Sequence, residues 1–350
     1  MRMTRCGLIC CFGWGIVAAI AQPVLAHGGT LIVLNKSDAT ASLLDRRTGK
    51  EFAKIPTGVG PHEVAVSADG RTAVVCNYGG RTPGSTLTVI DLPRKTVRST
   101  IDLGKYRRPH GIVFLADGHR VVVTAEQQKA LLIVDTASAK VVGTVDTDQR
   151  ISHMVEITPK GDRAFVANIG SGSISVIDLK AAQRLKVIPT GDGAEGLDIS
   201  PDGREVWVAN RAANNLSVVD AKTLEVIQTV DCAAFPIRVK FTPDGRRVLV
   251  SNAKTGDVAV FDAKQRNEIR RIPMKVQAVE KKDDRLFGDR FGDSPVPVGI
   301  VIPPDGRQAY VANTNADLIT VIDLKTWKIT GRLTAGREPD GMGYTPLELK

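Results

Sequence analysis

Three of the five histidines share one position in a repeated pattern. His62, His110 and His153 each lie eight residues before a glycine that closes a recurring turn. In chain order this position is filled by His62, His110, His153, Glu195, Ile237, Val298 and, when the last repeat is aligned on Thr345-Pro346, Asp340. Imidazoles that converge with a carboxylate suit a borderline metal such as Zn or Cu. They could equally serve as a general base and an anion holder.

The glycine that anchors this alignment recurs six times, almost always after aspartate. The positions are Gly70, Gly118, Gly161, Gly203, Gly245 and Gly306, with spacings of 48, 43, 42, 42 and 61 residues. A fixed period near 42 residues is typical of a repeat architecture. Within each period the apolar residues alternate, as in AVVCN, VWVAN and ITVID, which predicts strands. Four strands in a period of this length predict one blade of a β-propeller.

The two ends of the sequence together supply one further blade. Residues 339–344 predict a first strand with nothing after it, while 31–35, 41–45 and 51–55 predict a second, third and fourth strand without a first. Joining one strand to three covers edges that would otherwise invite association. The sequence therefore predicts one all-β domain over residues 27–350. It is a seven-bladed propeller of four-stranded blades, closed by its own termini.

The repeat also carries a family resemblance. Residues 165–168, 207–210 and 310–313 read FVAN, WVAN and YVAN, and Ser-Pro-Asp-Gly or Thr-Pro-Asp-Gly precedes several such segments. This pattern resembles the YVTN-type β-propeller repeat family, which is grouped with archaeal surface-layer propellers and lactonase-like propellers. The resemblance covers the chain after about its first 30 residues. It implies the propeller fold and no single function, because this repeat hosts many roles.

Residues 1–26 predict a signal peptide of bacterial type. A basic start precedes a short apolar run, and Val24-Leu-Ala26 precedes an expected cleavage site before His27. The mature chain is therefore expected in the periplasm or outside the cell, without a membrane span. It would keep only Cys76 and Cys232. Because the repeat places these two on distant blades, we expect both thiols to be free.

The charge and the motifs narrow the function classes. The formal net charge is +9, but the positive residues are scattered and aromatic residues make up 5% of the chain. Nucleic-acid-binding proteins cluster their positive charges and interleave aromatic side chains, so no nucleic-acid partner is expected. No P-loop, nucleophile elbow, HExxH motif or dinucleotide-binding glycine pattern is present.

Four arginines and one insert are predicted to share a face with the histidines. In a propeller, the fourth-to-first and second-to-third strand loops open on one face, called here the top face. Those loops contain Arg81, Arg108, Arg211 and Arg238, and guanidinium groups bind carboxylates and phosphates in two-point contacts. The 61-residue spacing predicts an insert over residues 273–297, also on the top face. Long loops in compact folds are often functional.

A structural role is the alternative for every one of these residues. The Pro-His step could be a device that starts a strand, with each imidazole bonded to a neighbouring loop, although it occurs in few blades. The asparagine and aspartate that recur in nearly every blade are expected to be structural, because such residues bond local backbone in turns.

The sequence thus favours a periplasmic binding protein. It would present a His- and Arg-rich top face to a small anionic ligand or to a periplasmic protein. The alternative is a metal-dependent hydrolase or lyase, lactonase-like, that uses His62, His110 and His153 with a divalent Zn or Cu ion. A third possibility is an accessory subunit of a periplasmic redox enzyme, but no haem-attachment motif supports it.

Overall fold

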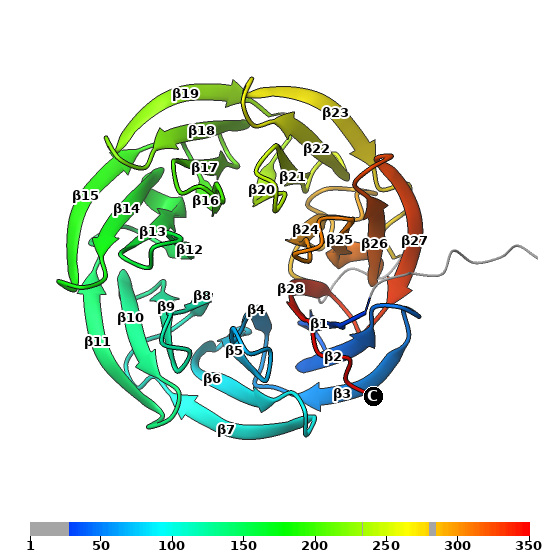
Figure 1. The fold of residues 1–350 in the computed structure, drawn as a ribbon, viewed down its shortest axis with the longest axis horizontal. Coiled ribbons are helices and arrows are strands. Elements are labelled where there is room, and N and C mark those ends of the chain that lie inside the picture. Colours follow the sequence, from blue (N-terminus) through cyan, green and yellow to red (C-terminus); the bar gives the residue numbers. More distant parts are fainter. Residues whose placement is uncertain (1–27, 233, 280–284) are drawn as a thin grey trace, which may run out of the picture.

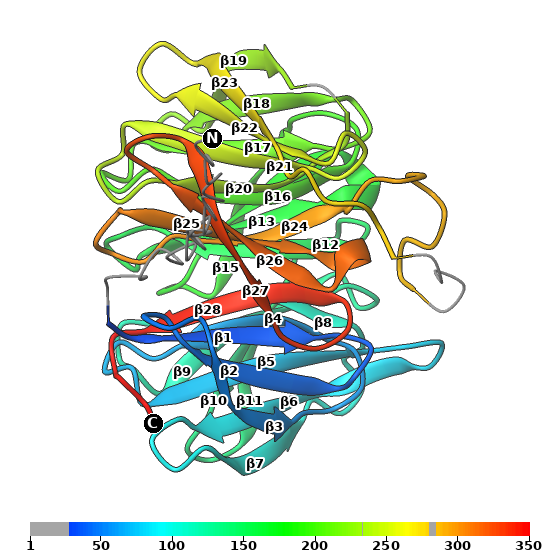
Figure 2. The ribbon, with the colours of Figure 1, turned by 90° about the vertical axis from the view of Figure 1, so that its right-hand side faces the viewer.

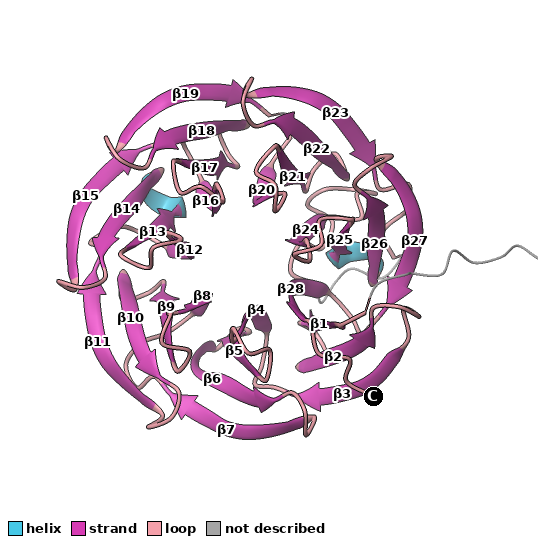
Figure 3. Ribbon diagram, in the orientation of Figure 1, coloured by secondary structure: helices cyan, strands magenta, loops and turns pink. Residues whose placement is uncertain are grey.

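The computed structural model describes residues 28–232, 234–279 and 285–350, so the predicted signal peptide and His27 lie outside the described residues. Seven antiparallel sheets of four strands surround one axis (Figure 1). This arrangement confirms the predicted all-β, seven-bladed propeller. Apart from two short 3-10 turns, η1 (Ile169–Ser171) and η2 (Thr314–Ala316), the described elements are all strands (Figure 3).

The first three blades follow one another along the chain. Blade one contains β4 (Pro61–Val66), β5 (Thr72–Gly79), β6 (Pro83–Asp91) and β7 (Thr96–Asp102). Blade two contains β8 (Pro109–Phe114), β9 (Arg120–Ala125), β10 (Ala130–Asp135) and β11 (Lys140–Asp146). Blade three contains β12 (Ser152–Ile157), β13 (Arg163–Asn168), β14 (Ser173–Asp178) and β15 (Gln183–Pro189).

The remaining blades continue around the ring. Blade four contains β16 (Ala194–Ile199), β17 (Glu205–Asn210), β18 (Asn215–Asp220) and β19 (Glu225–Asp231). Blade five contains β20 (Pro236–Phe241), β21 (Arg247–Asn252), β22 (Asp257–Asp262) and β23 (Asn267–Pro273). Blade six contains β24 (Pro297–Val301), β25 (Gln308–Asn313), β26 (Leu318–Asp323) and β27 (Lys328–Thr334). Blade seven joins β28 (Pro339–Thr345) to β1 (Thr30–Asn35), β2 (Thr40–Asp45) and β3 (Glu51–Pro56).

Blade seven closes the ring through both ends of the described chain. Strand β28 pairs antiparallel with β1, with Leu31 opposite Tyr344 and Val33 opposite Met342. This pairing confirms the predicted closure. Behind it, the Arg46 guanidinium, which is 1% exposed, donates hydrogen bonds of 2.8 and 3.0 Å to the Asp305 carboxylate of blade six.

The recurring aspartates bond local backbone, as predicted, whereas the recurring asparagines bond mainly side chains of the neighbouring strand. The side-chain amide of Asn77 donates to Thr86 and Thr88, and its oxygen accepts from the backbone N–H of Gly58 at 3.0 Å. The recurring aspartates accept backbone N–H groups two or three residues ahead, as Asp220 does from Lys222 and Thr223. They hold the turn between the third and fourth strands of each blade.

Side-on, the propeller has two unlike faces. Residues 274–279 and 285–296 and the β5–β6 hairpin project on one side, and the C-terminal end lies on the other (Figure 2). Pro61 at the start of β4 pairs with Asn77 at the hairpin end of β5, so the inner strands begin on the side of those projections. This side is the top face.

Two further predictions concern cysteines and membrane spans. Cys76 and Cys232 are both buried and free, as expected. Among the described residues, no helix is long and apolar enough to cross a membrane.

Candidate functional site

The seven aligned positions form one ring around the axis on the top face. Each is the second residue of its blade's inner strand, so the alignment made from the repeat glycine is correct. We call this set the axial ring: His62, His110, His153, Glu195, Ile237, Val298 and Asp340. All seven side chains are buried, and the three histidines are 4%, 1% and 7% exposed.

A shared backbone irregularity positions the axial ring. In blade one, Pro61 pairs with Asn77, but the next paired residue is Val64, so His62 and Glu63 are released from the ladder. The other inner strand pairs show a corresponding register shift near this point. Such bulges re-aim side chains next to functional sites. Five of the seven strands begin with proline, which lacks the N–H that a ladder position would need.

The three histidines pack against one another. The ring centroids of His110 and His153 are 3.5 Å apart, and those of His62 and His110 are 5.0 Å apart. Tyr78 stacks on His62 with centroids 4.3 Å apart. Neighbouring blades therefore bring the predicted histidines together.

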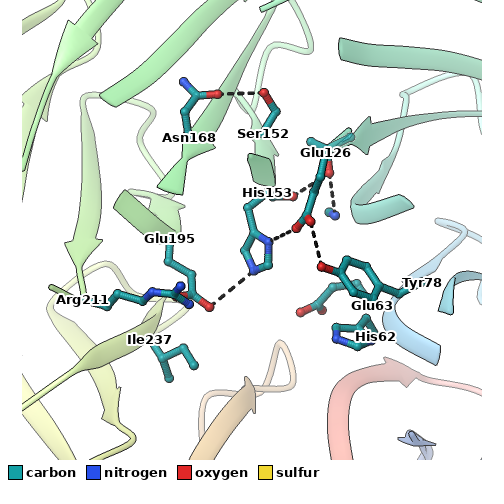
Figure 4. Close-up of polar contacts among 12 residues, drawn as sticks. His62, Glu63, Tyr78, Glu126, Ser152, His153, Asn168, Glu195, Arg211 and Ile237 are labelled. Atoms are coloured by element: carbon teal, nitrogen blue, oxygen red, sulfur yellow. Dashed lines mark hydrogen bonds and ion pairs between the residues drawn. The ribbon is translucent and has the colours of Figure 1, made fainter. Parts of the chain in front are cut away.

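A chain of hydrogen bonds and ion pairs crosses blades one to four (Figure 4). The Tyr78 hydroxyl donates to Glu126 Oε2 at 2.8 Å, and Glu126 Oε1 lies 2.5 Å from His153 Nδ1. On its other side, His153 Nε2 lies 3.4 Å from Glu195 Oε1. The second oxygen of Glu195 pairs with Arg211. His153 is thus held between two carboxylates.

This arrangement separates the pKa values of the histidines. Burial lowers the pKa of His62 and His110 well below the ordinary range, so both are neutral at neutral pH. Burial would also lower the pKa of His153, but its contacts with the carboxylates of Glu126 and Glu195 raise it. Burial would raise the pKa of Glu195, yet the His153 hydrogen bond and the Arg211 charge bring it to about 2.

The residues that could hold a metal ion differ from the predicted trio. His110, Glu126 and His153 each offer a ligand atom, and these atoms lie within 4.8 Å of one another. His62 is adjacent but outside this group, and its Nδ1 lies 3.1 Å from the Gly60 carbonyl oxygen. Nδ1 of His110 is buried and has no hydrogen-bond partner among the described residues.

The predicted acid and arginines take different places. Asp340 Oδ2 lies 3.8 Å from His62 Nε2, inside the cluster. Arg238 donates to Glu63 Oε1 at 2.7 Å and lies 3.5 Å from Glu195. Arg211 and Arg238 are therefore already neutralised by carboxylates, which weakens the expectation that they attract an anion.

The other two arginines belong to the β5–β6 side of the site. The Arg108 guanidinium lies 4.5 Å from the centroid of the Tyr78 ring. Arg81 is exposed at the hairpin tip, and no ion pair or hydrogen bond within the described part of the chain joins it to the cluster.

Sequence reasoning missed a second set of residues at this site. These residues are Lys36, Tyr78 and Glu126, and each lies one residue after the repeat asparagine position of its blade, as the predicted Arg211 also does. In blade two the sequence did point to this position. Ala125 replaces the repeat asparagine in blade two, and the residue after it is Glu126.

The insert lies against the rim of blades five and six. Phe291 packs on Phe235 with ring centroids 4.9 Å apart, and Phe287 packs on Phe291 at 5.7 Å. Ile237 and Val298 of the axial ring belong to the same apolar cluster. The insert therefore contacts the apolar side of the ring.

Comparisons with known proteins concern the fold. No curated protein matches the sequence. Among solved structures, the chain is similar to hydrazine synthase of Kuenenia stuttgartiensis, with a TM-score of 0.68 and 19% identity, covering 80% of this chain and 88% of that chain. It is also similar to a functionally unknown protein from Desulfotomaculum acetoxidans, with a TM-score of 0.73 and 14% identity, covering 91% and 99%. Over residues 151–282, the chain matches a family model described as a YNCE-like beta-propeller.

Proposed function

We propose that this protein is a metal-binding β-propeller that holds a divalent zinc or copper ion through His110, Glu126 and His153. One observation carries the proposal. A buried, neutral imidazole nitrogen, Nδ1 of His110, has no hydrogen-bond partner in the described part of the chain, and a carboxylate and a second imidazole lie beside it. A buried polar atom without a partner costs free energy, which a bound ion would offset.

The chemistry of the donor set suits such an ion. Two imidazoles and one carboxylate form the mixed nitrogen and oxygen set that zinc accepts and that copper also binds. In a tetrahedral zinc site, neighbouring ligand atoms lie about 3.4 Å apart. The 2.5 Å contact between Glu126 and His153 would therefore lengthen as a cation replaced the shared proton.

The groups behind these ligands support the proposal. Metal-binding imidazoles commonly donate their other N–H to a carboxylate, which fixes the ring. If His153 binds through Nδ1, its Nε2 is already directed at Glu195, 3.4 Å away. The free oxygen of Glu126 accepts the Tyr78 hydroxyl. Both ligands are therefore oriented before any ion arrives.

The test is metal content in a protein purified without a histidine tag. The full chain is dialysed against zinc or copper, then against buffer, and metal is counted by mass spectrometry. We expect one ion per chain in the native protein and none in His110→Asn. His119→Asn is the matched control, because His119 is exposed in the β8–β9 turn. A native protein without metal, or full retention in His110→Asn, would refute the proposal.

A metal-dependent hydrolase or lyase is the second candidate, and the number of ligands favours it. Three protein ligands leave a tetrahedral ion one position for water, as in catalytic zinc sites. The measurement is hydrolysis of a panel of lactones by the zinc-loaded protein. Activity that disappears in His110→Asn supports the enzyme, and no turnover with a fully loaded site leaves a binding protein.

A further inference from the structure

Four cations surround the histidine cluster, and they divide into two pairs. Arg211 and Arg238 form ion pairs with Glu195 and Glu63. For Lys36 and Arg108, no ion pair with a carboxylate occurs within the described residues. The two pairs lie on different sides of the cluster, because Arg211 and Arg238 belong to blades four and five, whereas the unpaired cations flank blade one.

Lys36 is the more unusual of the two. It directly follows β1, and its backbone N–H donates to the Glu338 carbonyl at 3.0 Å. Its ammonium nitrogen is buried and has no hydrogen-bond partner in the described structure. Burial lowers the pKa of Lys36 to about 8, although the charges of Asp340 and Glu338 act against this. A buried ammonium without a partner is costly unless something else pairs with it.

Arg108 lies against Tyr78. Its guanidinium lies over the Tyr78 ring, and one nitrogen donates to the Gly80 carbonyl at 3.0 Å. Tyr78 in turn stacks on His62. The Lys36 charge acts on His62, and the Arg108 charge acts on Lys36. Two like charges are therefore held near the His62–Tyr78 pair, and within the described residues neither forms an ion pair or a hydrogen bond with a carboxylate, although the charges of Asp340 and Glu338 act on Lys36.

We propose that Lys36 and Arg108 form a binding site for a small oxyanion, a carboxylate or a phosphate, above the His62–Tyr78 pair. An ammonium supplies a point charge and a guanidinium supplies a planar pair of N–H donors, and together they suit such a group. A neighbouring imidazole, His62, adds a polar wall. Only the idea that this anion lies next to a metal ion rests on the function proposed above.

The test uses metal-free full-length protein and two probes, succinate and inorganic phosphate, in separate calorimetric titrations at low ionic strength. We expect at least one probe to bind, and Lys36→Met and Arg108→Met each to weaken it at least tenfold. Arg81→Met is the matched control, since Arg81 is an exposed arginine of the β5–β6 hairpin. The probe that binds identifies the anion class.

The outcomes separate this site from the metal site. Binding of neither probe to the native protein overturns the anion proposal, as does equal weakening by Arg81→Met. Zinc content of Lys36→Met is measured in parallel and should equal that of the native protein. Anion binding by a protein that takes up no zinc would refute only the metal proposal, whereas zinc uptake without anion binding would refute only this one.

Discussion

Two buried positions recur in the blades, and their residues behave differently. The repeat asparagines are the same in six blades, and in each of those blades the side-chain amide donates within the blade. The axial ring changes from blade to blade, from histidine through glutamate to isoleucine and valine. Its histidines contact one another across neighbouring blades. A residue that every blade repeats stabilises the fold, whereas a position that differs among blades is available for a site.

Removal of β28 should have the largest effect on stability, because it tests closure of the ring by the termini. A chain that ends at Arg337 loses the strand that pairs with β1 and exposes two strand edges. We expect the free energy of unfolding to fall by about 5 kcal/mol or more, since paired backbone and buried apolar surface are lost together. Thermal melting beside the full chain measures this. An unchanged melting temperature would contradict closure by the termini.

Replacing one repeat asparagine by a side chain of similar size should cost less but remain clear. Asn77→Leu leaves the Gly58 N–H and the hydroxyls of Thr86 and Thr88 without their amide partner. At about 1–3 kcal/mol for each buried group that stays unpaired, we expect a loss of about 2–4 kcal/mol. Urea unfolding gives the value, and zinc content should not change. An unchanged free energy of unfolding would show that Asn77 does not stabilise the fold.

A third polar cluster lies further along the inner strands. Its effect on the free energy of unfolding is expected to depend on pH. Lys240 Nζ lies 3.3 Å from Asp198 and 3.5 Å from Glu156. Asp198 also accepts the backbone N–H groups of Ile199 and Phe241. Burial, followed by repulsion from Asp198, raises the pKa of Glu156 to about 7, although Lys240 acts against this rise.

The raised pKa of Glu156 determines whether stability rises or falls with pH. A carboxyl group with a raised pKa stabilises the fold below its unfolded value of 4.5, and this contribution disappears as the pH rises towards 7. We therefore expect the native protein to lose about 3 kcal/mol more stability than Glu156→Gln between pH 4.5 and 7.5. Urea unfolding at both pH values measures the difference. If the native protein and Glu156→Gln lost equal stability over this pH range, Glu156 would not be the group responsible.

The smallest effect on stability is expected at the axial ring itself. His110→Phe keeps an aromatic ring between His62 and His153 and removes a nitrogen that has no partner. The free energy of unfolding of the metal-free protein should change by less than about 1 kcal/mol, because no hydrogen bond is lost. Zinc binding should nevertheless disappear. A large destabilisation would assign His110 to the structural set, like Asn77.

The repeat made the fold and the axial ring predictable. The glycine alignment placed His62, His110 and His153 correctly, because one backbone geometry recurs in every blade. Glu126 and Lys36 escaped, since each lies in a loop and becomes important only through the neighbouring blade. The pairing of Arg238 with Glu63 escaped because it joins strands of blades five and one, which are not adjacent in the ring. Contacts between blades depend on how the ring closes, which periodicity within a blade does not encode.

The bulge at the start of each inner strand has a consequence for redesign. Because the ladder skips the axial ring position, a side chain can be exchanged there without altering the hydrogen bonds that hold the sheet. The propeller therefore offers seven axial ring positions at which side chains can be exchanged, all around the same axis. Ile237 and Val298 occupy two of these positions with apolar side chains. Histidine or a carboxylate residue placed there would create a second set of metal-ligand atoms on the same fold.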